Sequence, residues 1–172
     1  MKAELETPLT ARRTMLGLAA SAGCFLLAGR PANAQSVEGD LAILSAALWL
    51  EHEGIAAYQA GAESGLLSPG ILKVAVAFQS DHKHHRDGII GAIGLLGGTA
   101  IGPDNQYSFG RLRNENDILR LAWSKEKGAV VAYSTLAANI QNRTVLNVGA
   151  NVLVDEVRHL TVLNSVLGIP NF

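Results

Sequence analysis

Four long segments of the sequence carry apolar residues at alternating spacings of three and four. They are residues 40–64, 69–98, 114–139 and 142–168. This spacing keeps one face of an α-helix apolar, and the strict alternation of polar and apolar residues that indicates a strand is absent from the sequence. The sequence therefore predicts an all-α protein in which each of four helices buries one face.

The lengths of the linkers predict how these helices are connected. Gly65 and the pair Ser68-Pro69 separate the first two helices, with Ser68 as the expected N-cap, and the link between the last two is equally short. Short links join antiparallel neighbours. The middle link, residues 99–113, could extend over about 50 Å at about 3.3 Å per residue, which exceeds the roughly 38 Å of a helix of about 25 residues. We therefore expect a four-helix bundle of two antiparallel helical hairpins joined by a long crossover.

The first 34 residues have the features of an export signal. Arg12 and Arg13 precede a mildly apolar run at residues 15–29, and small residues up to Ala34 suit cleavage after that position. Paired arginines before a core rich in Gly and Ala favour a twin-arginine (Tat) signal. A general secretory signal and a lipoprotein signal that uses Cys24 are the alternatives. The sequence predicts an exported, periplasmic protein.

Residues 35–172 would then form one domain with few obvious partners. The chain has 14 basic and 15 acidic residues, of which the signal holds four and two, so 10 and 13 remain. This balance gives no electrostatic reason to expect nucleic acid or an anionic membrane surface as a partner. No segment of this domain has the roughly 18 apolar residues that membrane insertion requires. Cys24, the only cysteine, lies in the signal, so any metal must be held by histidines and carboxylates.

A shift of 75 residues aligns the first half of this domain with the second. It aligns four polar positions on two different helices: Glu51 with Glu126, Tyr58 with Tyr133, Asp81 with Glu156, and His84 with His159. One such match arises easily by chance, whereas four at the same shift do not. We interpret the chain as two related helical hairpins.

Each predicted helix has a carboxylate on the stripe that should be buried, and the second and fourth add a histidine one turn later. The six residues are Glu51, Asp81, His84, Glu126, Glu156 and His159. Ionised carboxylates in an apolar core cost several kcal/mol each, and no Lys or Arg lies on these stripes at the same level. Two divalent cations would balance four carboxylates, and neutral imidazoles would complete the ligand shells. We therefore predict that these six residues bind two divalent metal ions.

With these residues the chain resembles the ferritin-like superfamily, and in particular the exported ferritin-like domain proteins of bacteria. The resemblance covers about residues 40–168 and rests on LWLEHEGIAAY around Glu51, Asp81-His-Lys-His84, SKEKGAVVAY around Glu126 and Glu156-Val-Arg-His159. It implies a carboxylate-bridged dinuclear centre and an oxidoreductase that oxidises Fe(II) or reduces peroxide or dioxygen. Hard oxygen ligands and imidazole favour iron over manganese.

The second helix departs from the usual Glu-x-x-His of this family. Asp81 is shorter than glutamate by one methylene, so we expect that metal position to bind more weakly or to be bridged asymmetrically. His85, four residues after Asp81, is the alternative ligand to His84. We expect the other polar residues of this stretch to face solvent: His82, Lys83, Arg86 and Asp87.

Several further features leave alternatives open. Tyr58 and Tyr133 could be core residues whose hydroxyl groups are hydrogen-bonded. Alternatively, they could contact the residues that surround the metal ions. A stripe of glycines in the second helix predicts close approach to a neighbouring helix or across a homodimer interface: Gly88, Gly91, Gly94 and Gly97. The alternative function is that of a metal-free helical bundle that binds a protein or a small ligand. The sequence does not indicate an electron donor.

Overall fold

The computed structural model describes residues 32–170, and within them every regular element is an α-helix. The helices are α1 (Ala32–Glu63), α2 (Pro69–Leu95), α3 (Glu115–Ala137) and α4 (Arg143–Leu167). The predicted all-α, four-helix fold is confirmed. The predicted signal, residues 1–34, lies outside the described residues except for 32–34, which begin α1.

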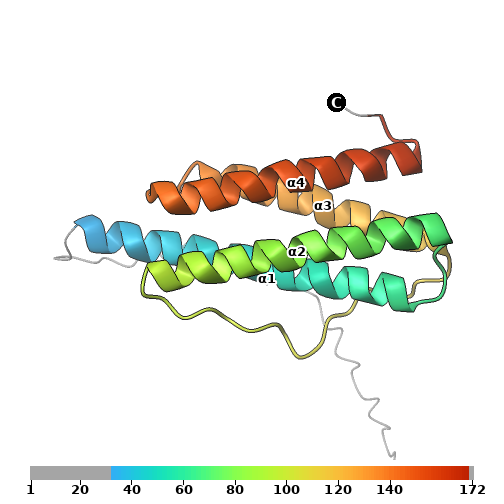
Figure 1. Ribbon diagram of the computed structural model, residues 1–172, viewed down its shortest axis with the longest axis horizontal. Helices are drawn as coiled ribbons and strands as arrows, with labels where there is room; N and C mark the ends of the chain where they lie inside the picture. The colour runs from blue at the N-terminus through green and yellow to red at the C-terminus, as the bar shows by residue number, and fades with distance from the viewer. Residues whose placement is uncertain (1–31, 171–172) are drawn as a thin grey trace, which may run out of the picture.

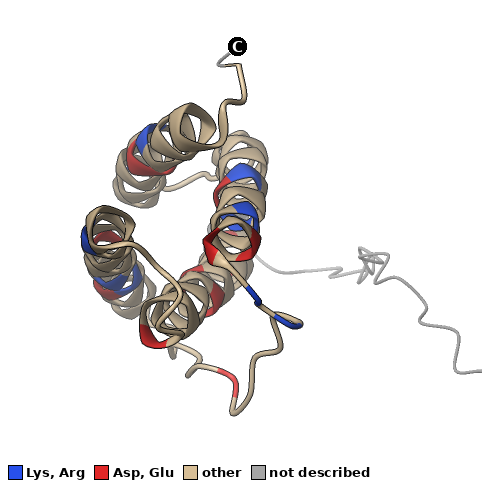
Figure 2. Ribbon diagram, turned by 90° about the vertical axis from the view of Figure 1, so that its right-hand side faces the viewer, with Lys and Arg blue, Asp and Glu red and all other residues tan. Residues whose placement is uncertain are grey.

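Two antiparallel hairpins build the bundle, as predicted. Figure 1 shows α1 and α2 as one hairpin and α3 and α4 as the other, and the crossover that connects them runs lengthwise along the outside of the bundle. Each helix packs against two neighbours, so that α1 contacts α2 and α3, while α4 contacts the same two helices from the opposite corner. Viewed along the bundle, the four helices surround a common core and the crossover lies outside it (Figure 2).

Local sequence accounts for where three of the helices begin. The side chain of Asn114 accepts a hydrogen bond from the backbone of Asp117 at the start of α3, and Asn142 caps the start of α4 in the same way. Ser68 precedes Pro69, the first residue of α2, but its side chain makes no capping hydrogen bond. Proline at the first helical position has no N–H group and needs no acceptor, and α2 begins at Pro69 without the predicted side-chain cap.

Side chains of α1 hold two of the loops. In the middle of α1, Trp49 Nε1 donates to Asp104 Oδ2 of the crossover at 3.0 Å. Nearer the start of α1, Asp40 is buried and accepts hydrogen bonds from the backbone N–H groups of Gln141 and Asn142 at 2.9 and 2.8 Å. Asp40 therefore ties the start of α1 to the turn between α3 and α4.

The apolar core divides into two clusters, with polar residues between them. One cluster is centred on Leu48, Ile89 and Ile93, and the other on Phe78 and Leu163. The two clusters lie on either side of this polar layer along the bundle axis, and they shield its side chains from water in both directions. This layout places the candidate site in the middle of the bundle.

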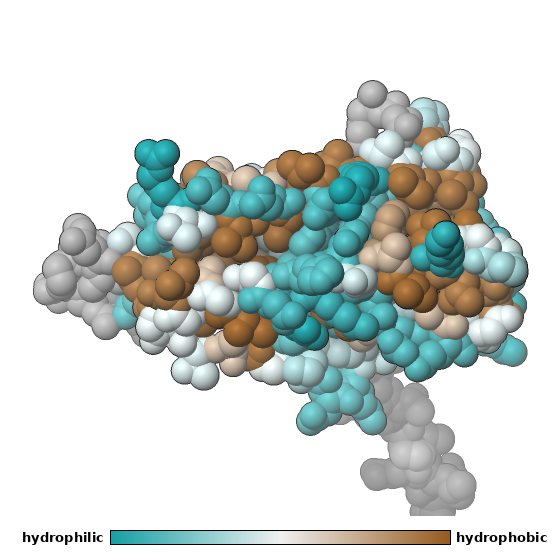
Figure 3. Space-filling model, viewed as in Figure 1, coloured by the Kyte–Doolittle hydropathy of each residue, from teal (hydrophilic) through white to brown (hydrophobic). Residues whose placement is uncertain are grey.

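The outer surface carries scattered apolar residues. On the face formed by α2 and α4, a hydrophilic band lies between more apolar areas (Figure 3). Of the four glycines of the stripe, Gly88 lies within ordinary contact distance of α4, since a Cβ there would be 3.9 Å from Val148, whereas a Cβ on Gly91, Gly94 or Gly97 would meet nothing within 4 Å. A homodimer contact there remains a prediction. No helix among the described residues is both long enough and apolar enough to cross a bilayer.

Candidate metal centre

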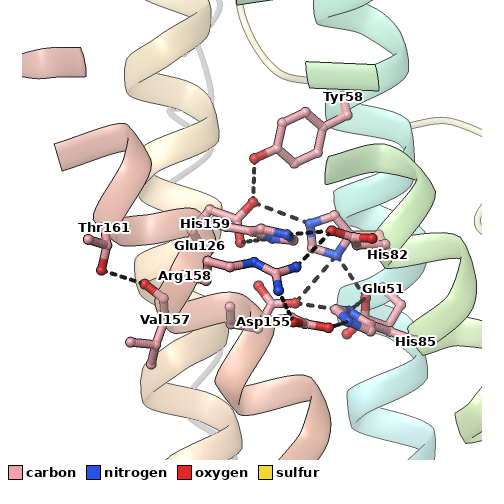
Figure 4. A network of polar contacts seen from close by, with 12 residues as sticks. Glu51, Tyr58, His82, His85, Glu126, Asp155, Val157, Arg158, His159 and Thr161 are labelled. Carbon is pink, nitrogen blue, oxygen red and sulfur yellow. Dashed lines mark hydrogen bonds and ion pairs between the residues drawn. The ribbon is translucent and has the colours of Figure 1, made fainter. Parts of the chain in front are cut away.

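Six buried histidine and glutamate side chains meet in the middle of the bundle. Helices α1 and α3 contribute one glutamate each, α2 contributes two histidines, and α4 contributes a glutamate and a histidine. The six are Glu51, His82, His85, Glu126, Glu156 and His159. None of them is more than 7% exposed, and Figure 4 shows side chains of this set converging from the four helices.

These side chains form two groups that could each hold a metal ion. The first consists of Glu51, His82, His85 and Glu156, and the second of His82, Glu126, Glu156 and His159. In each group, one potential ligand atom per residue lies within 4.8 Å of all the others. The groups share His82 and Glu156, which makes them two adjoining positions of one centre.

The structure brings four of the six predicted residues together and leaves two outside. Glu51, Glu126, Glu156 and His159 are buried in the centre. Asp81 lies at its edge with a side chain that is 32% exposed. His84 is exposed on α2, so the prediction that it faces inward is wrong. The alternative, His85, faces inward, and so does His82, for which a solvent-facing position was predicted incorrectly.

A difference in length between the two hairpins explains this error. Ser68, before α2, follows Glu51 by 17 residues, whereas Asn142, before α4, follows Glu126 by 16. The shift of 75 that aligns α1 with α3 therefore becomes 74 for α2 and α4. The shift of 74 aligns three pairs: Asp81 with Asp155, His82 with Glu156, and His85 with His159.

The buried apolar residues of α2 carry a signal that could have revealed the correct positions. Ala75, Phe78, Ile89 and Ala92 are buried, and continuing their three-four spacing through the polar stretch selects positions 82 and 85. The predicted stripe instead followed the repeat through Asp81. Because adjacent residues on a helix are about 100° apart, an error of one position turns a side chain away from the core.

Two aspartates hold the histidines of the centre from outside. His85 Nε2 lies 3.1 Å from Asp155 Oδ2 on α4, and His159 Nε2 lies 3.1 Å from Asp81 Oδ2 on α2. Each imidazole thus donates one N–H to an outer carboxylate and directs Nδ1 into the centre, an arrangement that fixes ring orientation and tautomer in metal sites. Arg158 joins both carboxylates, at 3.0 Å from Asp155 and 3.2 Å from Asp81 (Figure 4).

Two tyrosines reach across the bundle to the glutamates. Tyr58 of α1 donates its hydroxyl to Glu126 of α3, and Tyr133 of α3 donates to Glu51 of α1. Both tyrosines are buried. Each hydroxyl contacts Oε1 of its glutamate, so Oε2 faces the centre, where Glu51 Oε2 contacts His82 and Glu126 Oε2 has no hydrogen-bond partner.

A close contact with the backbone of α1 helps to position His82. A Cβ built on Gly54 would lie 3.2 Å from the His82 imidazole, closer than most such contacts. Glycine therefore lets this ring pack against α1. His82 Nδ1 lies 2.8 Å from Glu51 Oε2 and His82 Nε2 lies 3.3 Å from Glu126 Oε1, so the ring stands between glutamates of two different helices.

Burial and close charges perturb the acid–base properties of the metal-free centre. Burial, reinforced by the nearby Glu126 carboxylate, raises the pKa of Glu156 to about 9. Burial alone would lower the pKa of His85, but the carboxylates of Glu156 and Glu51, 3.2 and 3.5 Å from its Nδ1, raise it to about 10. The pKa of His82 is raised well above its usual value for a similar reason, since its contacts with Glu126 and Glu51 outweigh burial. Positive imidazoles thus offset the glutamates in the absence of another cation.

Five buried atoms of the centre have no hydrogen-bond partner in the described part of the chain. They are His85 Nδ1, Glu126 Oε2, both carboxylate oxygens of Glu156 and His159 Nδ1. A buried polar atom without a partner costs about 1–3 kcal/mol, and these five are directed toward one small region. Carboxylate oxygen and imidazole nitrogen are ligands that iron, manganese and zinc accept. The donor set therefore fits one or two divalent metal ions.

Comparison with known proteins gives a consistent result. The family model for the ferritin-like domain matches residues 39–169. No curated protein matches the chain significantly. A conserved hypothetical protein, Rv2844, from Mycobacterium tuberculosis is similar in structure, with a TM-score of 0.71 and 25% identity over 80% of this chain and 96% of that one.

Two other solved structures have the same fold at lower identity. The dodecameric thioferritin from Bacteroides fragilis, a bacterioferritin-related protein, has a TM-score of 0.65 and 20% identity, covering 77% of this chain and 86% of that one. A ferritin-like, diiron-carboxylate protein from Bacillus anthracis has a TM-score of 0.66 and 18% identity, covering 77% and 97%. At these identities the comparison supports the fold alone.

Proposed function

The chain belongs to the ferritin-like domain family, and from this premise we propose that it binds two divalent metal ions in the middle of its bundle. Glu51 and His85 would hold one ion, and Glu126 and His159 the other. His82 and Glu156 lie in both groups and would serve both ions. The six proposed ligands replace Asp81 and His84 of the sequence prediction with His82 and His85.

The single observation that carries this proposal is the set of five buried ligand atoms without hydrogen-bond partners. A folded protein rarely leaves so many buried polar atoms unsatisfied in one place. Metal coordination would satisfy all five at once. The outer contacts of His85 and His159 with Asp155 and Asp81 support it further, because they leave the two Nδ1 atoms available as ligands.

We propose iron as the metal and a redox reaction as the function. The Bacillus anthracis relative in fold is described as a diiron-carboxylate protein, and the three-glutamate, three-histidine set suits iron. A bound iron pair would supply two electrons, which with two protons would reduce dioxygen to hydrogen peroxide or hydrogen peroxide to two waters. The chain would contribute a site closed to bulk water by the two apolar clusters, and hydroxyl groups of Tyr58 and Tyr133 that hold Glu126 and Glu51 in place.

Metal analysis tests this proposal directly. Protein purified without oxygen and incubated with Fe(II) or Mn(II) should retain up to two ions per chain after desalting, as measured by elemental analysis. The double variant Glu126→Ala with Glu156→Ala removes ligands from both positions and should retain none, provided that circular dichroism shows the helices intact. Wild-type protein that retains neither metal would contradict the proposal.

A second candidate function, a metal-free bundle that binds a protein or a small ligand, has one observation in its favour. His82 lies between Glu51 and Glu126 at 2.8 and 3.3 Å, where a protonated imidazole could take the place of a cation. In that case Fe(II) would leave the thermal midpoint unchanged. Replacing both Glu51 and His82 with leucine would then preserve or raise the free energy of unfolding, because well-packed apolar residues often equal a buried ion pair in stability.

We also propose that the protein is exported with residues 1–34 as its signal and that copies of it assemble. Support for export is the arginine pair and apolar run of the sequence. Support for assembly comes from the glycine stripe of α2 and from the bacterioferritin-related protein of Bacteroides fragilis, which is dodecameric. The smallest such assembly is a homodimer, in which the glycine face of α2 would pack against a second copy of the chain. Sedimentation of the protein without residues 1–34 would test assembly, with a monomer as the contradicting result.

A further inference from the structure

An apolar cavity of about 30 Å³ lies beside the candidate metal centre. It lies among the four helices toward the end of the bundle where α1 turns into α2. Small side chains leave the space: Ala57, Ala75 and Ala122 line it, together with Tyr58, Phe78 and Leu163. The core on the other side of the centre is packed more tightly, with a cavity of about 10 Å³.

The lining of this cavity excludes water as its natural occupant. A buried water makes about three hydrogen bonds to polar groups. The one side-chain polar group among the lining residues is the Tyr58 hydroxyl, which already donates to Glu126. Dry apolar cavities in proteins bind small apolar molecules, including xenon. The cavity therefore selects an apolar ligand.

The volume limits how large that ligand can be. A cavity needs about 10–15 Å³ by this measure to hold a single water molecule, so 30 Å³ accommodates a ligand of about two heavy atoms. A fatty acid or another lipid tail would require the helices to move apart. A diatomic gas fits without such movement.

Two aromatic rings form a common wall between the cavity and the centre. Tyr58 lines the cavity and contacts Glu126 with its hydroxyl. Phe78 lines the cavity and stacks on the ring of His159, with the ring centroids 3.9 Å apart. A molecule in the cavity is thus separated from the proposed ligands by a single layer of side chains.

We propose that this cavity binds a small apolar molecule of the size of dioxygen and holds it next to the centre. The cavity itself follows from packing alone. Its use as a site for a reactant rests on the proposed function of the metal centre. Dioxygen dissolves better in apolar surroundings than in water, so the cavity would raise its local concentration beside the proposed metal ligands.

Xenon binding tests the cavity without any metal. Crystals of the protein pressurised with xenon should show one xenon atom between Ala75, Phe78 and Ala122. Ala75→Leu fills the cavity and should abolish this site, whereas the matched control Ala77→Leu, at an exposed position on the same helix, should retain it. If Ala75→Leu fails to fold, Ala122→Val adds less volume and should lower xenon occupancy. Absence of xenon from the wild-type cavity, or its full retention in the filled variant, would overturn the proposal.

A stopped-flow measurement tests the use of the cavity. Fe(II)-loaded Ala75→Leu should react with dioxygen several-fold more slowly than the wild type while binding the same amount of Fe(II), and Ala77→Leu should react at the wild-type rate. Equal rates in all three proteins would overturn this use. Protein that takes up xenon but no Fe(II) would refute the metal proposal alone, and protein that takes up Fe(II) but no xenon would refute the cavity proposal alone.

Discussion

His82 occupies the place where the two groups of potential ligands meet. Its ring nitrogens face Glu51 and Glu126, and the position corresponds to Glu156 in the other hairpin. The usual ferritin-like metal site takes one glutamate from each of two helices and a Glu-x-x-His pair from each of the other two, which gives four carboxylates and two imidazoles. The centre of this chain has three carboxylates and three imidazoles. We expect it to be richer in nitrogen ligands than that pattern.

Separate replacement of His82 and His84 by alanine tests the assignment of His82 as a ligand. His82→Ala removes a ligand shared by both groups, so it should weaken Mn(II) or Fe(II) binding by more than the roughly 10- to 100-fold typical of outer-shell changes. His84→Ala, the matched control, alters an exposed residue two positions away and should leave binding within twofold of wild type. Isothermal titration with Mn(II) measures both. Strong loss in His84→Ala with normal binding in His82→Ala would restore the sequence-based assignment.

At the scale of the helix, a polar side chain near the start of α1 helps to arrange the bundle. Asp40 is 1% exposed and accepts two backbone N–H groups from the turn before α4. Backbone N–H groups at a helix start have no intrahelical partner. The contact holds the start of α4 beside α1. It therefore helps to set the position of α4 along the bundle axis, and with it the positions of Glu156 and His159 in the centre.

Replacement of Asp40 should therefore destabilise the whole domain. Asp40→Ala removes both hydrogen bonds, and we expect the free energy of unfolding to fall by about 2–4 kcal/mol, since hydrogen bonds to charged groups contribute about 1.5–3 kcal/mol each and are only partly additive. Urea denaturation followed by circular dichroism measures this. The control Asp87→Ala removes an exposed aspartate paired with Arg86, and exposed pairs contribute about 0–1 kcal/mol. Equal effects of the two changes would refute the role given to Asp40.

At the scale of the whole molecule, metal binding and folding should be coupled. The six proposed ligands come from all four helices, so unfolding of any helix disrupts the centre. A ligand present at 100 times its dissociation constant stabilises the folded state by about 2.7 kcal/mol.

Thermal unfolding provides the measurement of this coupling. Saturating Mn(II) should raise the thermal midpoint by several degrees, because about 1 kcal/mol shifts it by roughly 4 °C or less in a domain of this size. A chelator should reverse the shift. The Glu126→Ala, Glu156→Ala double variant is the control and should show no response to Mn(II). A midpoint that rises equally in both proteins would indicate metal binding elsewhere on the chain.

The sequence by itself determined the helices, their pairing and the buried glutamates. Apolar spacing located all four helices, and the linker lengths predicted two hairpins and the crossover, because chain length restricts which helix ends can be neighbours. Glu51, Glu126, Glu156 and His159 were identified because each lies within an unbroken apolar stripe. Such stripes define a face about 100° wide.

Only the tertiary structure decided which neighbours in the stretch Asp81–His85 face inward. Five polar residues there offer no apolar member to mark the buried face, so the buried stripe can be extended either by the repeat through Asp81 or by the spacing of the flanking apolar residues through His82 and His85. The structure places His82 and His85 in the centre, moves Asp81 to its edge beside His159, and exposes His84. The physical reason is that a helix turns by about 100° per residue, so the rotation of α2 in the bundle, set by packing of Phe78 and Ile89, determines which side chains point inward.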